Sequence, residues 1–190
     1  AEAGADIVVA ARRTEEIEAI ADKIRALGRK ALAITTDMME IEQVQALADQ
    51  TFRDMGALSC WVSNAGGADD RVPRTFLEMP ERQWDFQLNL NLKAVWTGAQ
   101  AAGNIMKDNG GGSIINISSI LGLTGLEKLS AYCASKGAVR LFTKAVALEC
   151  GRDGSDIRVN SIHPGYIHTA MMEADCIRDY GDIPTGLAEL

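Results

Sequence analysis

The sequence lacks several features that would place it in a particular class of protein. It has four cysteines, which are widely spaced and form no CxxC pair: Cys60, Cys133, Cys150 and Cys176. Disulfide frameworks and zinc sites need paired or clustered thiols, so we expect neither and predict a reducing compartment, the cytoplasm. His163 and His168 have no acidic cluster near them in the sequence and are interpreted as plain loop residues, so we assign no metal.

Basic tracts and long apolar runs are missing as well. The formal net charge is −7 at pH 7, whereas proteins that bind nucleic acids gain much of their affinity by neutralising phosphates with basic side chains. No apolar run reaches the ~18 residues that a membrane-spanning helix needs, and no signal peptide opens the sequence. We therefore predict neither a nucleic-acid partner nor a membrane partner.

The sequence does contain enough apolar material for one folded domain. Hydrophobic residues make up 47% of its 190 residues, which is typical of a globular protein with a sizeable core. We find no internal repeat, low-complexity tract or interdomain linker, so we predict a single domain over residues 1–190. The first residue is alanine, and we expect the natural chain to start further upstream.

Short apolar runs alternate along the chain with segments of helical periodicity. The apolar runs predict strands over residues 5–11, 30–37, 57–67 (ending in a glycine turn), 113–119 and 156–165. The periodic segments predict helices over residues 14–28, with Thr14 as N-cap, and over 39–56, 81–112 and 130–151, with Pro73 and Pro80 in the loop before the third helix. The tail from Tyr166 is poorly periodic. This alternation is typical of an α/β fold whose parallel sheet is covered on both faces.

Polar residues follow each predicted strand. They are Arg12 and Arg13, Asp37, Asn64 to Gly67, Ser119, and Pro164 to Thr169. Because ligands of parallel α/β sheets bind beyond the carboxyl ends of the strands, the sequence predicts that these residues share one cleft.

Tyr132 and Lys136 are four residues apart in a predicted helix, and Ser119 ends the strand before it. Residues four apart lie on one helix face. A cation near a tyrosine favours the phenolate and lowers a pKa that is otherwise ~10, so the phenol can exchange a proton with an alcohol or carbonyl oxygen. Ser119 can donate a hydrogen bond to the same oxygen. A tyrosine and a lysine at this spacing also occur by chance in many helices, with the lysine solvated.

On the basis of these residues and of the segments quoted below, the chain resembles the short-chain dehydrogenase/reductase family over most of its length. Ser119, Tyr132 and Lys136 match the family's catalytic triad in order and spacing. "SNAG" (Ser63 to Gly66) is similar to the family's NNAG turn, "NLNLKAVW" to its NxNLxGxF segment, and "HPGYIHT" to its PGxxxT stretch. The resemblance implies a Rossmann-like, doubly wound, three-layer fold.

The resemblance also implies roles for single residues. Asn91 matches a catalytic asparagine that kinks a helix and holds a proton-relay water. The implied cofactor-binding residues are Arg12, Arg13, Asp37, Met38, Asn64, Ala65, Gly66, Tyr132, Lys136, Pro164, Gly165, Ile167 and Thr169. Two alternatives without a functional role stay open. The SNAG segment can be an ordinary turn, and Asn91 can be a helix position that faces solvent. The aromatic Trp84, Phe86 and Trp96 are interpreted as core or subunit contacts.

The residues after the first strand indicate which nicotinamide cofactor is preferred. Family members that prefer NAD usually carry an acidic residue there, which binds the ribose hydroxyls. This chain has Ala11 followed by Arg12 and Arg13. A guanidinium can pair with a 2′-phosphate and no carboxylate repels it, which favours NADP(H), with NAD(H) possible. The alternative is that both arginines are solvated loop charges.

Two family elements are missing from the sequence. One is the opening strand with its TGxxxGxG turn, which lies between the strands ending at Ala11 and near Ser63 in the family; the other is the last strand. We therefore expect an internal fragment of a chain of roughly 250 residues, which by itself would fold and bind cofactor poorly.

Three functions are compatible with the sequence. The first is an NADP(H)-dependent oxidoreductase for a secondary alcohol or ketone of the cyclic alcohol or hydroxysteroid type, with a 3-oxoacyl-[acyl-carrier-protein] reductase as the alternative of the same class. The others are a non-catalytic nucleotide-binding member and an inactive truncated product. The resemblance further implies a homotetramer joined through the two long helices.

Overall fold

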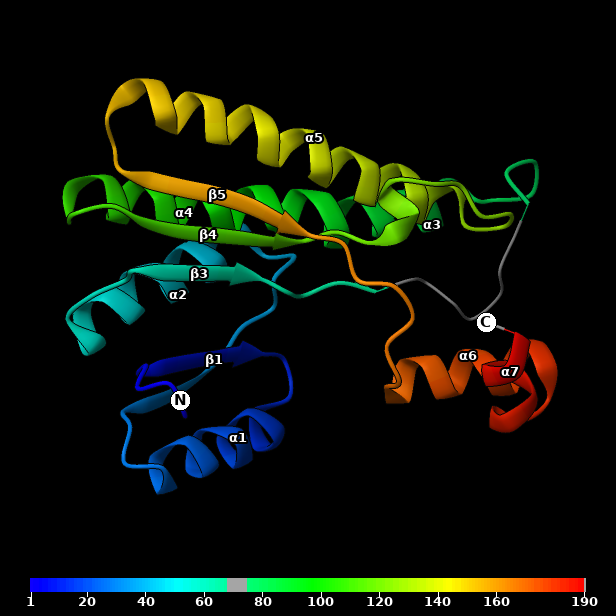
Figure 1. The fold of residues 1–190 in the computed structure, drawn as a ribbon, viewed down its shortest axis with the longest axis horizontal. Helices are drawn as coiled ribbons and strands as arrows, with labels where there is room; N and C mark the ends of the chain where they lie inside the picture. The colour runs from blue at the N-terminus through cyan, green and yellow to red at the C-terminus, as the bar shows by residue number, and fades with distance from the viewer. Residues whose placement is uncertain (68–74, 190) are drawn as a thin grey trace.

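The computed structural model describes residues 1–67 and 75–189 and contains the five predicted strands (Figure 1). They are β1 (Ile7–Ala11), β2 (Ala31–Thr35), β3 (Cys60–Ser63), β4 (Gly112–Ile117) and β5 (Ile157–Ile162). Pro73, in the predicted loop before the third helix, lies outside the described residues.

Helical segments connect the strands. They are α1 (Thr14–Ala26), α2 (Ile41–Met55), α3 (Glu81–Leu88), a π-helical segment η1 (Asn89–Lys93), α4 (Ala94–Asp108), a short 3₁₀ turn η2 (Ile120–Gly122), α5 (Ser130–Asp153), α6 (Ala170–Tyr180) and α7 (Ile183–Glu189). Within the described residues, no helix combines the length and apolarity that crossing a membrane requires.

The strands pair in parallel in two separate groups. β1 pairs with β2, and β3, β4 and β5 form a second sheet in that order. In the second sheet Ser63 is level with Asn116, which is level with Ser161, so the three strands finish at one edge. In the residues described, β1 and β3 share no ladder. The division therefore falls where the family resemblance places an additional strand.

Helices cover opposite faces of the first sheet. Successive strand residues point to opposite faces. Ile7 and Val9 pack on the small core of α1, whereas Val8 and Ala10 pack on the larger core that contains α2. The doubly wound α/β fold predicted from the alternation of strands and helices is confirmed.

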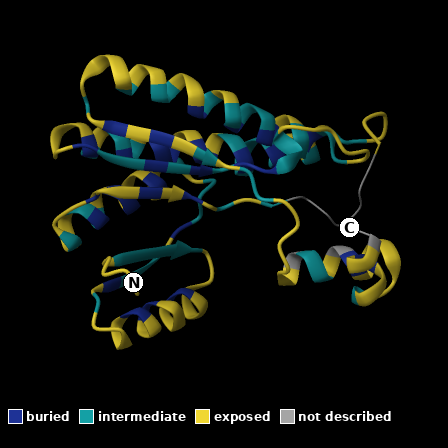
Figure 2. Cartoon of the chain, viewed as in Figure 1, coloured by how far each residue is buried: buried dark blue, intermediate teal, exposed yellow. Residues whose placement is uncertain are grey.

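The larger core joins both sheets. It packs α2 and α4 against β3, β4 and β5, with Trp61, Met106 and Ile114 among its buried members. Gly98 on α4 lets the Trp61 ring approach, because a Cβ there would lie 2.7 Å from Trp61 Nε1. The face of the β3–β5 sheet opposite α2 and α4 is less covered than the face that they pack on (Figure 2). Val62 in β3 is 52% exposed.

The structure corrects two local expectations. Thr14 is not the N-cap of α1: Arg13 is in that place, and the Thr14 hydroxyl instead lies 2.7 Å from that of Thr35. The tail from Tyr166, whose poor periodicity predicted no particular element, forms α6 and α7. Thr169 caps α6 by accepting a hydrogen bond from the Met172 amide (3.3 Å), a local contact that apolar periodicity does not reveal.

Candidate active site

Tyr132 and Lys136 lie one turn apart near the start of α5. The Lys136 ammonium nitrogen is 5.8 Å from the centroid of the Tyr132 ring. The same nitrogen donates a hydrogen bond of 2.9 Å to the carbonyl of Ile117, the last residue of β4. Both side chains are therefore held at the carboxyl end of the second sheet, where the sequence predicted them.

Lys136 is buried, with 4% of its surface exposed. Burial disfavours the charged form, and it lowers the pKa of Lys136 from 10.5 to about 8. At neutral pH the ammonium still predominates, so a positive charge remains beside the tyrosine ring.

Ser119 lies just beyond β4 and caps the η2 turn. Its backbone is extended, and its hydroxyl oxygen accepts a hydrogen bond of 3.1 Å from the Leu121 amide. Because the oxygen acts as acceptor there, the hydroxyl hydrogen can be donated to another oxygen at this end of the sheet. The residue is buried at 8% exposure, and η2 packs against α5, which carries Tyr132.

Asn91 is fully buried, so its interpretation as a solvent-facing helix position is wrong. Its amide nitrogen donates to the Gly67 carbonyl and to Gln87 Oε1, both at 2.7 Å, and its amide oxygen accepts from the Gly67 amide at 3.0 Å. The helical segment that carries it widens into the π-helical turn η1. The glycine turn after β3 is therefore anchored to the helix through Asn91.

Gly66 lies where Asn91 and Lys136 converge. A Cβ at this position would be 2.9 Å from Asn91 Oδ1 and 3.2 Å from Lys136 Nζ. A Cβ here would push the Asn91 amide oxygen aside and crowd the Lys136 ammonium, so glycine lets the turn approach both groups without displacing them. The SNAG segment thus does more than reverse the chain, although its role toward a cofactor stays a prediction.

The residues after β1 and β2 lie at the end of the first sheet. Arg12 and Arg13 are both exposed, and Arg13 forms an ion pair with Glu16. Asp37 is half-buried, and its carboxylate accepts a hydrogen bond of 3.0 Å from the Met39 amide, which shapes the turn that contains Met38. Their proposed contacts with a cofactor are therefore compatible with their exposure.

The remaining predicted positions follow β3 and β5. Asn64 is exposed and Ala65 is half-buried. The Pro164 carbonyl accepts a hydrogen bond of 3.0 Å from the Ile120 amide, which joins the loop after β5 to the residue following Ser119. Beyond it, the chain is exposed at Gly165, Ile167 and Thr169.

The sequence reasoning missed Gln87, and the structure decides part of the interpretation of the aromatics. Gln87 is buried and fixes the Asn91 amide, but a glutamine inside a helical pattern carries no signal of such a contact. Trp84 and Trp96 are each 40% exposed, so they do not belong to the core. Their assignment as subunit contacts stays a prediction, and the buried aromatic in this part of the fold is Trp61.

Comparison with known proteins agrees with this fold. The family model described as short chain dehydrogenase matches residues 1–177. The chain is 36% identical over 181 residues to an NADP-dependent (R)-specific alcohol dehydrogenase of Lentilactobacillus kefiri, covering 90% of this chain and 67% of that protein. It is 35% identical over 172 residues to a cyclohexanol dehydrogenase of Acinetobacter, again covering 90% and 67%.

A solved structure is similar as well. The structure of a gluconate 5-dehydrogenase from Burkholderia cenocepacia in complex with NADP and tartrate superposes with a TM-score of 0.85 at 32% identity, covering 95% of this chain and 69% of that one. The chain belongs to the short-chain dehydrogenase family. It spans about two thirds of the length of the curated relatives that it matches, for example 66% and 64% of two of them.

Proposed function

We propose that the protein is an NADP(H)-dependent oxidoreductase that interconverts a secondary alcohol and a ketone. The observation that carries this proposal is the placement of Tyr132 beside the buried Lys136 ammonium, 5.8 Å from ring centroid to nitrogen, at the end of β4. A tyrosine with a cation beside it is suited to proton exchange with an alcohol oxygen.

In ketone reduction, Tyr132 gives its phenolic proton to the carbonyl oxygen, and in alcohol oxidation the phenolate takes the proton back. Lys136 stabilises the phenolate through its positive charge. Ser119 donates its hydroxyl hydrogen to the same substrate oxygen, where negative charge develops during the reduction. A nicotinamide held at this end of the sheet would supply the hydride to the carbonyl carbon or accept it from the alcohol carbon.

Asn91 has a different task from the other three residues. Its side-chain donors and acceptor are engaged with Gly67 and Gln87. Its side chain therefore holds the glycine turn against Lys136, and any proton-relay water would bind to the backbone of the widened η1 turn.

The chain's own residues fit a dinucleotide with a 2′-phosphate. Gly66 lets the turn after β3 lie close to Asn91 and Lys136, where a Cβ would crowd both side chains. Arg12 is exposed directly after β1 and, in the described part of the chain, has no ion-pair partner, whereas Arg13 is paired with Glu16. We therefore assign the phosphate to Arg12 first, with Arg13 secondary.

The substrate is proposed to be an apolar secondary alcohol of the cyclic type. Leu123 and Leu126, which follow η2, are 51% and 43% exposed, and Tyr166, which follows β5, is 49% exposed. Apolar groups on the two loops that flank Ser119 favour an apolar ring over a polyhydroxy acid. One relative's name, cyclohexanol dehydrogenase, agrees with this choice.

The experiment is a substrate panel with the full-length protein and NADPH. Loss of nicotinamide absorbance is followed with cyclohexanone, a ketosteroid, 5-ketogluconate and a β-ketoacyl thioester. We expect the cyclic ketone to give the highest kcat/KM. Turnover confined to the thioester would indicate the acyl reductase instead, and absence of turnover with every substrate would contradict the proposal.

A further inference from the structure

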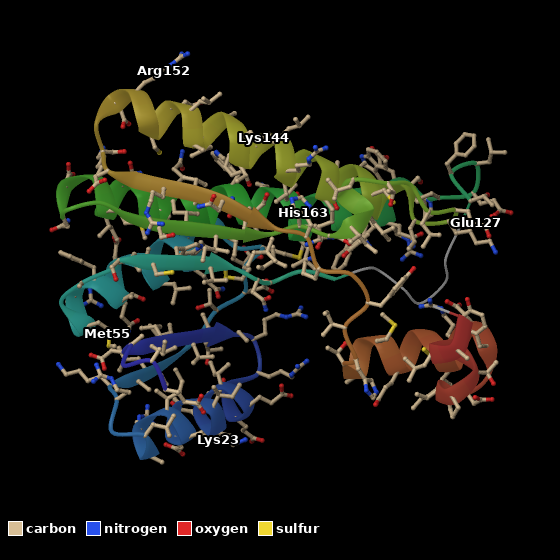
Figure 3. The ribbon with its side chains drawn as sticks, in the orientation of Figure 1. Lys23, Met55, Glu127, Lys144, Arg152 and His163 are labelled. Atoms are coloured by element: carbon tan, nitrogen blue, oxygen red, sulfur yellow. The ribbon has the colours of Figure 1, made fainter. Side chains whose placement is uncertain are left out.

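His163 connects the ends of two strands. It follows β5 directly (Figure 3). One ring nitrogen, Nε2, is 2.9 Å from the hydroxyl of Ser161, and the other, Nδ1, is 3.1 Å from the backbone carbonyl of Ser119. The ring is half-buried. A residue that the sequence indicated only as a plain loop histidine therefore bridges β5 and the residue that follows β4.

The partners of the ring fix which nitrogen carries hydrogen. The Ser119 carbonyl can only accept, so Nδ1 must be the donor. In the neutral ring Nε2 then accepts, and the Ser161 hydroxyl donates to it. The same carbonyl also accepts a hydrogen bond of 2.9 Å from the Gly122 amide. Both lone pairs of the Ser119 carbonyl are engaged, which fixes the orientation of that peptide plane.

The contact belongs to a short series that continues the β4–β5 pairing beyond the strand ends. The Ser118 amide donates to the Ile162 carbonyl at 2.8 Å, and the Ile120 amide donates to the Pro164 carbonyl at 3.0 Å. Between these two backbone bonds, the His163 ring bonds to the backbone carbonyl of Ser119.

We propose that His163 is a positioning residue that sets the direction of the Ser119 hydroxyl by holding the Ser119 carbonyl. The Ser119 carbonyl is held by the Gly122 amide on one side and by the imidazole on the other, while the Leu121 amide donates to the Ser119 hydroxyl. This inference rests on the proposed function, because the task of Ser119 comes from it. An error of about 1 Å in the placement of such a donor is enough to cost much of its effect on rate.

Two amide replacements separate the two contacts of the ring. In His163→Asn the side-chain nitrogen lies at the position of Nδ1, so it can still donate to the Ser119 carbonyl. In His163→Gln the nitrogen lies near the position of Nε2, so it reaches toward Ser161 and leaves Ser119. His163→Leu removes both contacts, and Ser161→Ala removes the Nε2 contact alone.

We expect kcat to fall about tenfold in His163→Leu and His163→Gln, the scale of one lost hydrogen bond to a buried carbonyl. His163→Asn and Ser161→Ala should stay within about threefold of the parent, since the Ser119 contact remains. The dissociation constant for NADPH should change little in all four variants. Equal losses in the Asn and Gln variants would overturn the proposal, because they would reflect loss of the ring itself.

A readout independent of activity is amide hydrogen exchange of the peptide that contains residues 119–123. We expect faster exchange in His163→Leu and His163→Gln and parental exchange in His163→Asn. Unchanged exchange in His163→Leu would overturn the positioning role even if kcat fell. If the parent protein shows no turnover, the proposed function fails by itself, and the exchange experiment alone then decides whether His163 holds the Ser119 segment.

Discussion

At the scale of single residues, the site depends on a lysine whose positive charge is disfavoured by burial. Lys136 is buried, its nitrogen bonds to the Ile117 carbonyl, and burial lowers its pKa to about 8. The charged form is therefore less favourable in the folded chain than in the unfolded chain, where the pKa is 10.5. A buried lysine with a lowered pKa is typical of a functional site.

This penalty predicts a pH dependence of stability. Between pH 8 and 10.5 the unfolded chain binds the Lys136 proton and the folded chain has released it, so the free energy of unfolding rises with pH. Relative to a Lys136→Met variant, the parent should gain about 3 kcal/mol between pH 7 and pH 10.5. Urea unfolding at several pH values measures this, and a constant difference would contradict it.

The proposed preference for NADP(H) also depends on single residues. Arg12→Ala should raise the dissociation constant for NADPH about tenfold or more and leave that for NADH nearly unchanged, because a charge-assisted bond to the 2′-phosphate is lost. Arg13→Ala should have the smaller effect, since Arg13 already pairs with Glu16. Fluorescence titration with both cofactors measures the ratio. Equal weakening of NADPH and NADH by Arg12→Ala would show that the arginine does not contact the phosphate.

At the scale of secondary-structure elements, periodicity predicted the strands and the long helices well. β-Branched runs and apolar spacing depend on local chemistry, and they located β1, β4 and α5 within a few residues. The π-helical turn η1 could not be predicted in this way. It reflects a tertiary contact, in which the buried Asn91 amide bonds to Gly67, a residue 24 positions away.

The same distinction applies to the candidate site. The placement of Ser119 after β4, and of Tyr132 and Lys136 on one face of α5, could be predicted because it follows from strand and helix geometry. Gln87 and His163 could not, since each acts through a neighbour that the fold brings to it: Asn91 in one case and the Ser119 carbonyl in the other. Family resemblance also added Asn91, which the helical pattern alone placed on the wrong side.

The turn between α4 and β4 offers a matched pair of glycines. Gly110 and Gly111 both have positive φ, 90° and 80°, but of the two only Gly111 lies where a Cβ would collide with the Asp156 carbonyl oxygen. Gly110→Ala should cost about 1–2 kcal/mol of unfolding free energy from backbone strain alone. Gly111→Ala should cost at least about 1–3 kcal/mol more through the collision.

Chemical denaturation of the two alanine variants measures the difference. Because the backbone strain is shared, the difference isolates the contact with Asp156. Similar stabilities for the two variants would show that the backbone at Asp156, just before β5, shifts easily to make room for the added Cβ. The turn would then not fix the position of β5.

At the scale of the whole molecule, three of the exposed apolar side chains lie on the two long helices α4 and α5. Leu141 and Leu148, seven residues apart on one face of α5, are 65% and 64% exposed, and Trp96 on α4 is 40% exposed. Exposed apolar side chains along a helix are typical of an association surface. We therefore propose that copies of the chain associate through α4 and α5.

Charge placed on that face should separate the copies. The double change Leu141→Lys with Leu148→Lys should lower the mass measured by light scattering, because like charges would be buried against each other. Leu27→Lys is the control, since Leu27 is also exposed, at 54%, but caps α1 elsewhere in the fold. An unchanged mass in the double variant, or an equal loss in the control, would contradict this surface.

The central claim is that Tyr132, beside the Lys136 ammonium, transfers the proton in a reaction between a nicotinamide and a secondary alcohol. Its most direct test compares kcat and the NADPH dissociation constant of full-length parent and Tyr132→Phe proteins, with the best ketone of the panel. We predict a fall in kcat of about 10²–10⁴-fold with a dissociation constant within about threefold of the parent. A variant that turns over at nearly the parental rate would contradict the account.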